Sequence, residues 1–78
     1  MIGLEEKIFQ VFKDVLALPS DIPRETIIYN SFPGWDSVAH MSIIAGLESA
    51  FDCMLDMQEI LDMSSFNNSL EIMRKYGG

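Results

Sequence analysis

The sequence predicts an all-α protein, a small four-helix bundle with a long first loop and a short third helix. Apolar residues recur at helical spacing in its longer segments, and no segment alternates between apolar and polar residues as a strand would. Acids and serines stand where helix N-caps are expected. With 78 residues the chain has room for one domain, residues 1–78.

The first half of the chain contains two predicted helices with a long connection between them. The first helix, residues 2–17, carries its apolar positions at Leu4, Ile8, Val11, Phe12 and Val15. Prolines 19 and 23 and the turn sequence "SFPGW" then predict irregular structure over residues 18–35, and loops of this length tend to be functional. The second helix is expected over residues 36–51, with its core stripe at Ile43, Ile44, Leu47 and Phe51.

The second half predicts two further helices. Asp56 and Glu59 have the spacing of a capping box, which indicates a short helix over residues 57–63. Ser64 or Ser65 is expected to cap the last helix, residues 65–76, whose buried stripe is Phe66, Leu70 and Met73.

Composition restricts the class of protein. Twelve acidic against five basic residues give a formal net charge of −7, which disfavours nucleic acid and anionic lipid as partners. The single cysteine cannot form an internal disulfide, and no Cys/His cluster offers a metal site. With no signal-peptide pattern and no apolar run long enough to cross a membrane, we expect a cytoplasmic, monomeric protein.

The stretch "FPGWDSVAHM", residues 32–41, allows three interpretations of Ser37. A catalytic serine needs a base and an orienting group in order, and the spacing of Asp36, Ser37 and His40 along one helix does not supply that order. A helix cap is the simplest interpretation of "DS" alone. The third is a point of attachment, because the N-terminus of a helix favours the negative charge of a phosphodiester.

The longer stretch "WDSVAHMSIIAGLESAFD" resembles the attachment region of acyl carrier proteins. The family's Asp-Ser-[Leu/Val/Met] core matches Asp36, Ser37 and Val38, and its Leu-Glu-x-x-Phe pattern matches Leu47, Glu48 and Phe51. The downstream sequence "MLDMQEILDMSSFNNSLEIM" is similar to the family's short third helix, turn and closing helix. The first helix and long loop are similar in layout only.

The resemblance implies a carrier, not an enzyme. Ser37 would receive 4′-phosphopantetheine from coenzyme A on a phosphopantetheinyl transferase, whose magnesium belongs to the transferase. Asp36 would help to dock that transferase. Acyl-transferring and acyl-modifying enzymes would then act on a thioester carried by the arm. The alternatives are a peptidyl or aminoacyl carrier and an unmodified helical adaptor.

Other residues have two interpretations each. His40 is expected to be a satisfied histidine at the core edge, with a group that senses the phosphate as the alternative. Cys53 is expected to be a packing or loop residue, with a reactive thiol as the alternative. Met57 and Met63 are expected in the core or at its edge, with the lining of an acyl chain as an alternative. Trp35 either braces the loop or meets a partner enzyme.

The expected partner surface lies around the second and third helices. It comprises Trp35, Val38, Ser42, Ala45, Glu48, Asp56 and Glu59. On the second helix, the face opposite the core stripe carries no charge. Its residues are Val38, Ala39, Ser42, Ala45, Gly46 and Ser49. Docking is therefore expected to depend on shape and small apolar contacts, as in a carrier dedicated to one pathway.

Overall fold

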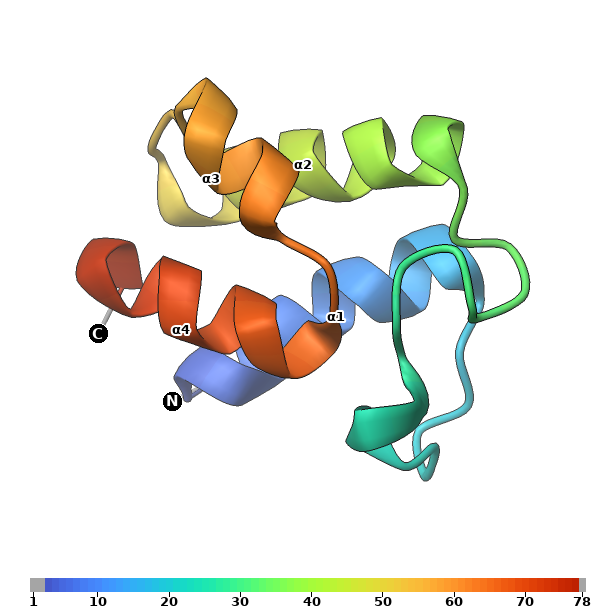
Figure 1. The fold of residues 1–78 in the computed structure, drawn as a ribbon. Coiled ribbons are helices and arrows are strands. Elements are labelled where there is room, and N and C mark those ends of the chain that lie inside the picture. The colour runs from blue at the N-terminus through green and yellow to red at the C-terminus, as the bar shows by residue number, and fades with distance from the viewer. Residues whose placement is uncertain (1–2, 78) are drawn as a thin grey trace.

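The computed structural model describes residues 3–77, and over that range it contains four α-helices (Figure 1). They are α1 (Leu4–Leu16), α2 (Ser37–Phe51), α3 (Met57–Asp62) and α4 (Phe66–Gly77), with a short 3-10 turn, η1 (Arg24–Thr26), in the first connection. The prediction of a small all-α bundle is confirmed. None of the helices in the described range is both long and apolar enough to span a membrane.

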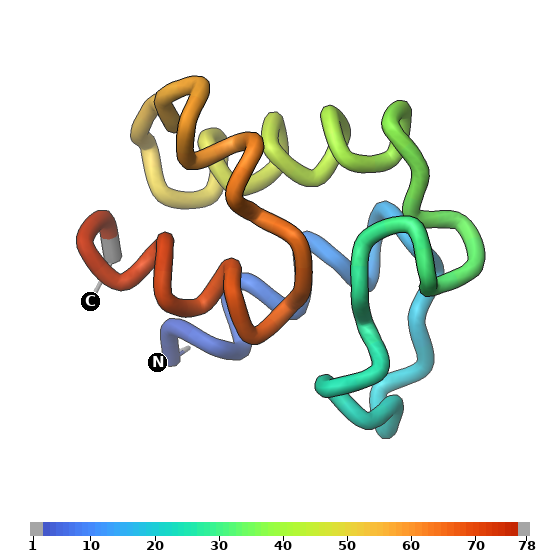
Figure 2. Tube along the Cα trace, in the orientation of Figure 1, coloured from blue at the N-terminus to red at the C-terminus, as the bar shows by residue number. Residues whose placement is uncertain are grey.

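The helices are arranged around α1, which packs against both α2 and α4. In the view of Figure 2, α2 lies along the top of the molecule and α4 lies below it. The short α3 runs from the end of α2 back toward the start of α4. The long first connection forms one side of the molecule.

The helix boundaries follow local capping chemistry. Asp36 caps α2, because its Oδ1 accepts a hydrogen bond from the Ala39 backbone N–H at 2.9 Å. The capping box predicted from Asp56 and Glu59 is confirmed at the start of α3. Before α4, it is Ser65 whose Oγ accepts from the Asn68 N–H, at 3.0 Å.

The end of α2 and the start of α3 are as predicted, and the other bounds differ from the expected ones by one or two residues. Helix α1 ends at Leu16 because Ala17 adopts a left-handed conformation with a φ of 56°. The expected start of this helix, at residue 2, lies outside the described residues.

The core draws on the long connection as well as on the helices. Leu18, Ile27 and Trp35 come from that connection and are at most 5% exposed. The Phe12 ring packs edge-on against Trp35 and against Phe66, with centroid distances of 5.1 and 5.3 Å. The connection is thus a packed part of the domain.

Hydrogen bonds fix this connection to the turn between α3 and α4. The Phe66 N–H donates to the Ile27 carbonyl at 2.9 Å, and the Tyr29 N–H donates to the Ser64 carbonyl at 2.8 Å. Residues far apart in the sequence therefore meet beside the start of α2.

The covered arc of α2 differs from the expected one. Ile43, Ile44 and Leu47 are buried as predicted, but Phe51 is only half-buried, with the Lys7 ammonium 4.5 Å from its ring centroid. Gly46, expected on the outer face, instead faces α1: a Cβ at this position would lie 2.7 Å from Cγ1 of Val11. Ala39 is also partly buried against the core. The buried face of α2 is therefore wider than the predicted stripe, because it also includes Ala39 and Gly46.

Candidate functional site

Ser37 is the first residue of α2, and its side chain is exposed. The carboxylate of Asp36 performs the capping, so the Ser37 hydroxyl is not occupied by the helix end. Its Oγ lies 3.2 Å from the hydroxyl oxygen of Tyr29. The capping interpretation therefore applies to Asp36, and the Ser37 hydroxyl stays accessible to a modifying enzyme.

An apolar groove of about 380 Å³ opens beside Ser37, between α2 and α3. Its apolar lining consists of Met41, Met57, Ile60, Leu61 and Met63. The remaining wall is polar and consists of Tyr29, Ser37, His40 and Ser64. The apolar lining can cover an apolar chain that is held near Ser37.

The lining methionines differ in exposure. Met57 is 70% exposed, whereas Met63 is 1% exposed and forms part of the core as well. Met63 is in the core as predicted, whereas the prediction of a core or core-edge position is wrong for Met57; both side chains line the groove. Because the thioether side chain is unbranched and polarizable, it adapts to guests of different shape.

His40 holds the groove wall to the loop before α2. Its Nδ1 accepts a hydrogen bond from the Trp35 indole N–H at 3.1 Å, and its Nε2 lies 2.9 Å from the Ile60 carbonyl oxygen. The prediction of a satisfied histidine at the core edge is confirmed. Since both ring nitrogens are engaged with these groups, His40 is not arranged as a general base for Ser37.

A shallow second hollow lies along the exposed face of α2 and shares Ser37 and Met41 with the groove. Val38, Met41, Ser42 and Ala45 line it together with Ser37. Val38 is 77% exposed and Met41 57% exposed, so two large apolar side chains lie together on this surface. Three residues of the expected partner surface, Val38, Ser42 and Ala45, are thus brought together next to Ser37.

Three other residues of the expected partner surface face inward. Trp35 is 1% exposed and Glu59 is 7% exposed, so neither offers a docking contact. Glu48 is half-buried, and its Oε2 accepts a hydrogen bond from the Leu55 N–H at 3.0 Å. Of the expected acidic residues, Asp56 is exposed, with its carboxylate bound to the Glu59 N–H.

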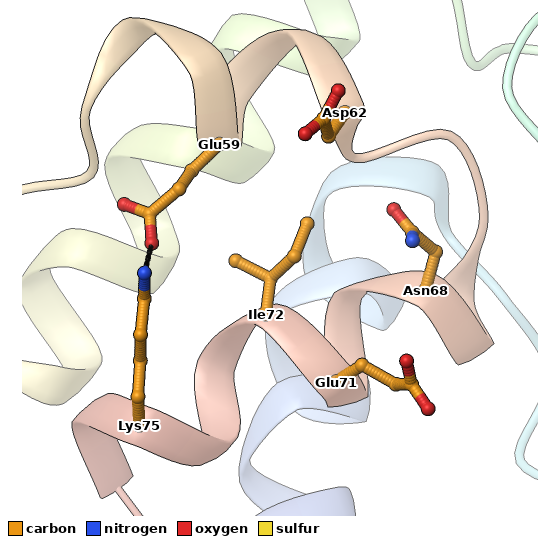
Figure 3. A pocket seen from close by; sticks show the side chains of 6 residues that line it. All are labelled: Glu59, Asp62, Asn68, Glu71, Ile72 and Lys75. Carbon is orange, nitrogen blue, oxygen red and sulfur yellow. Dashed lines mark ion pairs between the residues drawn. The ribbon is translucent and has the colours of Figure 1, made fainter.

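Glu59 turns inward because it joins α3 to α4 (Figure 3). Its carboxylate accepts hydrogen bonds from the Asp56 N–H and the Tyr76 hydroxyl and forms an ion pair with Lys75. The bonds from Lys75, Tyr76 and Asp56 lower the pKa of the Glu59 carboxyl to about 2. The same hydrogen bond, reinforced by burial, raises the pKa of Tyr76 to about 12. We call these residues the α3–α4 clasp: Asp56, Glu59, Lys75 and Tyr76.

A polar cleft of about 500 Å³ lies next to this clasp. Figure 3 shows its lining: Glu59 and Asp62 from α3, and Asn68, Glu71, Ile72 and Lys75 from α4. The Glu59–Lys75 ion pair crosses one end, and Ser37 is not among the lining residues. Among its polar side chains, Glu59 and Lys75 join the two helices, and the apolar groove at Ser37 is the better candidate for binding.

Cys53 behaves as the sequence predicts for a packing residue. Burial, followed by the nearby carboxylates of Glu48, Glu59 and Asp52, raises the pKa of its thiol. The thiol is therefore protonated at neutral pH and is a poor nucleophile.

Sequence reasoning did not find the rest of the groove. Tyr29 lies in a connection without periodicity, and Met41, Ile60 and Leu61 fall outside the predicted stripes. Only the two methionines beside the short third helix indicated a groove lining in the sequence.

In comparisons with protein-family models, curated proteins and solved structures, no match to the chain was found.

Proposed function

We propose that this chain is an acyl carrier protein that carries intermediates as thioesters on a 4′-phosphopantetheine arm attached to Ser37. The observation that carries the proposal is the exposed Ser37 hydroxyl at the start of α2, in a residue that lines an apolar groove. A phosphodiester on this oxygen would face the positive end of the helix dipole. The similarity of the "WDSV" region to the attachment region of carrier proteins supports the same assignment.

Asp36 has two compatible roles in this proposal. Its Oδ1 caps α2, while the residue as a whole remains exposed beside the attachment serine. An exposed carboxylate at this place is available to the transferase that modifies Ser37. The carrier itself performs no catalysis, and the metal ion of the transfer belongs to the transferase.

The lining of the groove favours an acyl cargo over an aminoacyl or peptidyl one. Its lateral wall is built from methionine, isoleucine and leucine side chains, which gain free energy by covering an apolar chain. An ammonium or a peptide group placed there would lose hydration without a charged partner from those side chains. We therefore assign a fatty-acid-like or polyketide-like pathway.

The surface around Ser37 supports a partner that docks by apolar contact. The hollow lined by Val38, Met41, Ser42 and Ala45 carries no charged side chain. Enzymes that recognise carriers through rows of acids would find few on this face. A dedicated pathway carrier fits this surface better than one shared with general fatty acid synthesis.

Mass spectrometry tests the attachment. Incubated with coenzyme A, magnesium and a broad-specificity phosphopantetheinyl transferase, the wild-type protein gains the mass of one phosphopantetheine. Ser37→Ala gains none, and Ser49→Ala, which removes an exposed serine farther along the same helix, outside the groove and the hollow, is modified like wild type. A wild-type chain that stays unmodified with several transferases would favour the helical adaptor.

The cargo class has its own test. Octanoyl-coenzyme A and an aminoacyl-coenzyme A are used as donors, so that the arm arrives already loaded, and the melting temperatures of the two products are compared with the unloaded form. The octanoyl chain stabilises the fold by binding in the groove, whereas the aminoacyl group does not. Stabilisation by the aminoacyl group alone would favour the aminoacyl carrier.

A further inference from the structure

We infer that Tyr29 is a positioning residue for the attachment serine, an inference that rests on the proposed function. Its hydroxyl oxygen lies 3.2 Å from Ser37 Oγ, within hydrogen-bond distance. The two residues come from different parts of the fold, the long first connection and the first position of α2. No other side-chain group of the described residues forms a hydrogen bond with Ser37 Oγ.

The phenol of Tyr29 is held in place from several directions. Its backbone N–H donates to the Ser64 carbonyl at 2.8 Å, and the preceding residue, Ile28, pairs with Ser65 in an isolated bridge. Its ring packs against Trp35 and His40, with centroid distances of 5.8 and 5.1 Å. Because Trp35 is buried, Tyr29 rests on a fixed base and presents its hydroxyl at a defined point.

Before modification, this contact restricts the side chain of Ser37. An exposed serine samples three staggered χ1 rotamers, and a hydrogen bond to a fixed partner favours one of them, whichever oxygen donates. In the transfer, Oγ forms a bond to the phosphorus of coenzyme A that carries the pantetheine, the Oγ proton passes to a base of the transferase, and the bond from that phosphorus to 3′,5′-ADP breaks. A preset Oγ lowers the orientational cost of this step.

After modification, the same hydroxyl has a new role. Oγ has lost its proton and has become an ester oxygen of a phosphodiester, whose free oxygens carry negative charge. Tyr29 then acts only as a donor, and its O–H binds the phosphodiester in a charge-assisted hydrogen bond. This bond holds the root of the arm beside the groove, where Tyr29 forms part of the wall.

The two tyrosines of the chain provide a matched test. Tyr29→Phe keeps the packed ring and removes only the hydroxyl. Tyr76→Phe removes a hydroxyl that binds Glu59 in the α3–α4 clasp and does not bind Ser37. Initial rates of modification are measured over a range of carrier concentrations with coenzyme A, magnesium and one purified transferase, and thermal melts verify that each variant is folded.

For Tyr29→Phe we expect kcat to fall about three- to tenfold, the effect of losing one hydrogen bond, with KM unchanged. Tyr76→Phe retains the kcat of wild type. In the modified proteins, the ³¹P NMR signal of the phosphodiester shifts in Tyr29→Phe and stays in place in Tyr76→Phe, which a purely structural role of Tyr29 would not produce.

The outcomes separate this inference from the proposed function. If wild type is modified while Tyr29→Phe has the same kcat and the same ³¹P signal, the positioning role is overturned and the carrier function stands. A rise in KM alone would make Tyr29 a docking contact and would also overturn it. If wild type is never modified, both proposals fall together.

Discussion

The indole N–H of Trp35 donates to Nδ1 of His40 at 3.1 Å, and the opposite nitrogen of the same imidazole lies 2.9 Å from the Ile60 carbonyl oxygen. With Nδ1 accepting, the ring proton belongs on Nε2, which donates to Ile60. One side chain thereby joins three segments: the long connection, α2 and α3. These are the segments that surround Ser37 and its groove.

Replacing His40 is therefore expected to destabilise the fold around the groove. His40→Leu leaves the buried Trp35 N–H without its acceptor and lowers the free energy of unfolding by about 1–3 kcal/mol. His40→Gln retains hydrogen-bonding groups and costs less. Urea unfolding followed by the fluorescence of the single tryptophan measures both variants. A leucine variant as stable as wild type would show that the bond to Trp35 contributes nothing.

The burial of the α2 core stripe predicts unequal losses of unfolding free energy when Leu47 and Phe51 are replaced by alanine. Leu47 is fully buried, so Leu47→Ala should cost about 2–5 kcal/mol of unfolding free energy. Phe51 is half-buried beneath the exposed Lys7, so Phe51→Ala should cost clearly less. Denaturant titration of the two variants side by side decides the order. Equal losses would mean that Phe51 is as well covered as Leu47.

Gly46 allows a close approach of α1 and α2. The Cβ of Gly46→Ala would lie 2.7 Å from Cγ1 of Val11, and such overpacking costs about 1–3 kcal/mol, more than the roughly 1 kcal/mol that alanine gains in helix propensity. We expect net destabilisation and partial rescue in Val11→Ala/Gly46→Ala. The four proteins of this double-mutant cycle are compared by urea unfolding, and strict additivity would contradict the steric explanation.

The α3–α4 clasp predicts a specific dependence of stability on pH. Since the folded protein holds the pKa of Glu59 at about 2, below its ordinary value of 4.5, the clasp stabilises the fold fully above pH 4.5. This stabilisation is lost as the pH falls from 4.5 through 2. Glu59→Gln cannot pair with the Lys75 charge, so its melting temperature should lie below that of wild type at pH 7.

The same comparison at acidic pH tests whether the charge of Glu59 causes the difference in melting temperature. As Glu59 becomes protonated, wild type should approach Glu59→Gln, and the difference between the two melting temperatures should shrink from pH 5 to pH 2. The other carboxyl groups titrate in both proteins and cancel in the difference. A gap that stays constant over this range would rule out the charge of Glu59 as its source.

The apolar surface beside Ser37 predicts how a partner enzyme docks. Val38→Glu and Met41→Glu place a charge on this exposed surface and should lower kcat/KM with the transferase about fivefold or more, with little change in melting temperature. Met54→Glu is the matched control, because Met54 is 85% exposed and lies beyond the opposite end of α2. Equal effects of all three variants would point to net charge alone.

Much of the helical structure could be predicted because the interactions that define it are local. Successive apolar positions of α1 are at most four residues apart. The Asp36 cap, the capping box of Asp56 and Glu59 and the cap at Ser65 each join residues three positions apart. The same local pattern singled out Ser37 next to its acidic neighbour. Segments of this kind carry their structural information in neighbouring residues.

The sequence by itself determined the all-helical class, the approximate helix bounds and the exposed serine at the start of α2. Only the tertiary structure decided that Trp35 and Glu59 turn inward, that Gly46 meets α1, and that Tyr29 reaches Ser37. These contacts join residues from separate elements of the fold. The packing of these elements decides which side of a helix is buried and which hydroxyl lies next to Ser37. The spacing of residues along a single helix does not specify that packing.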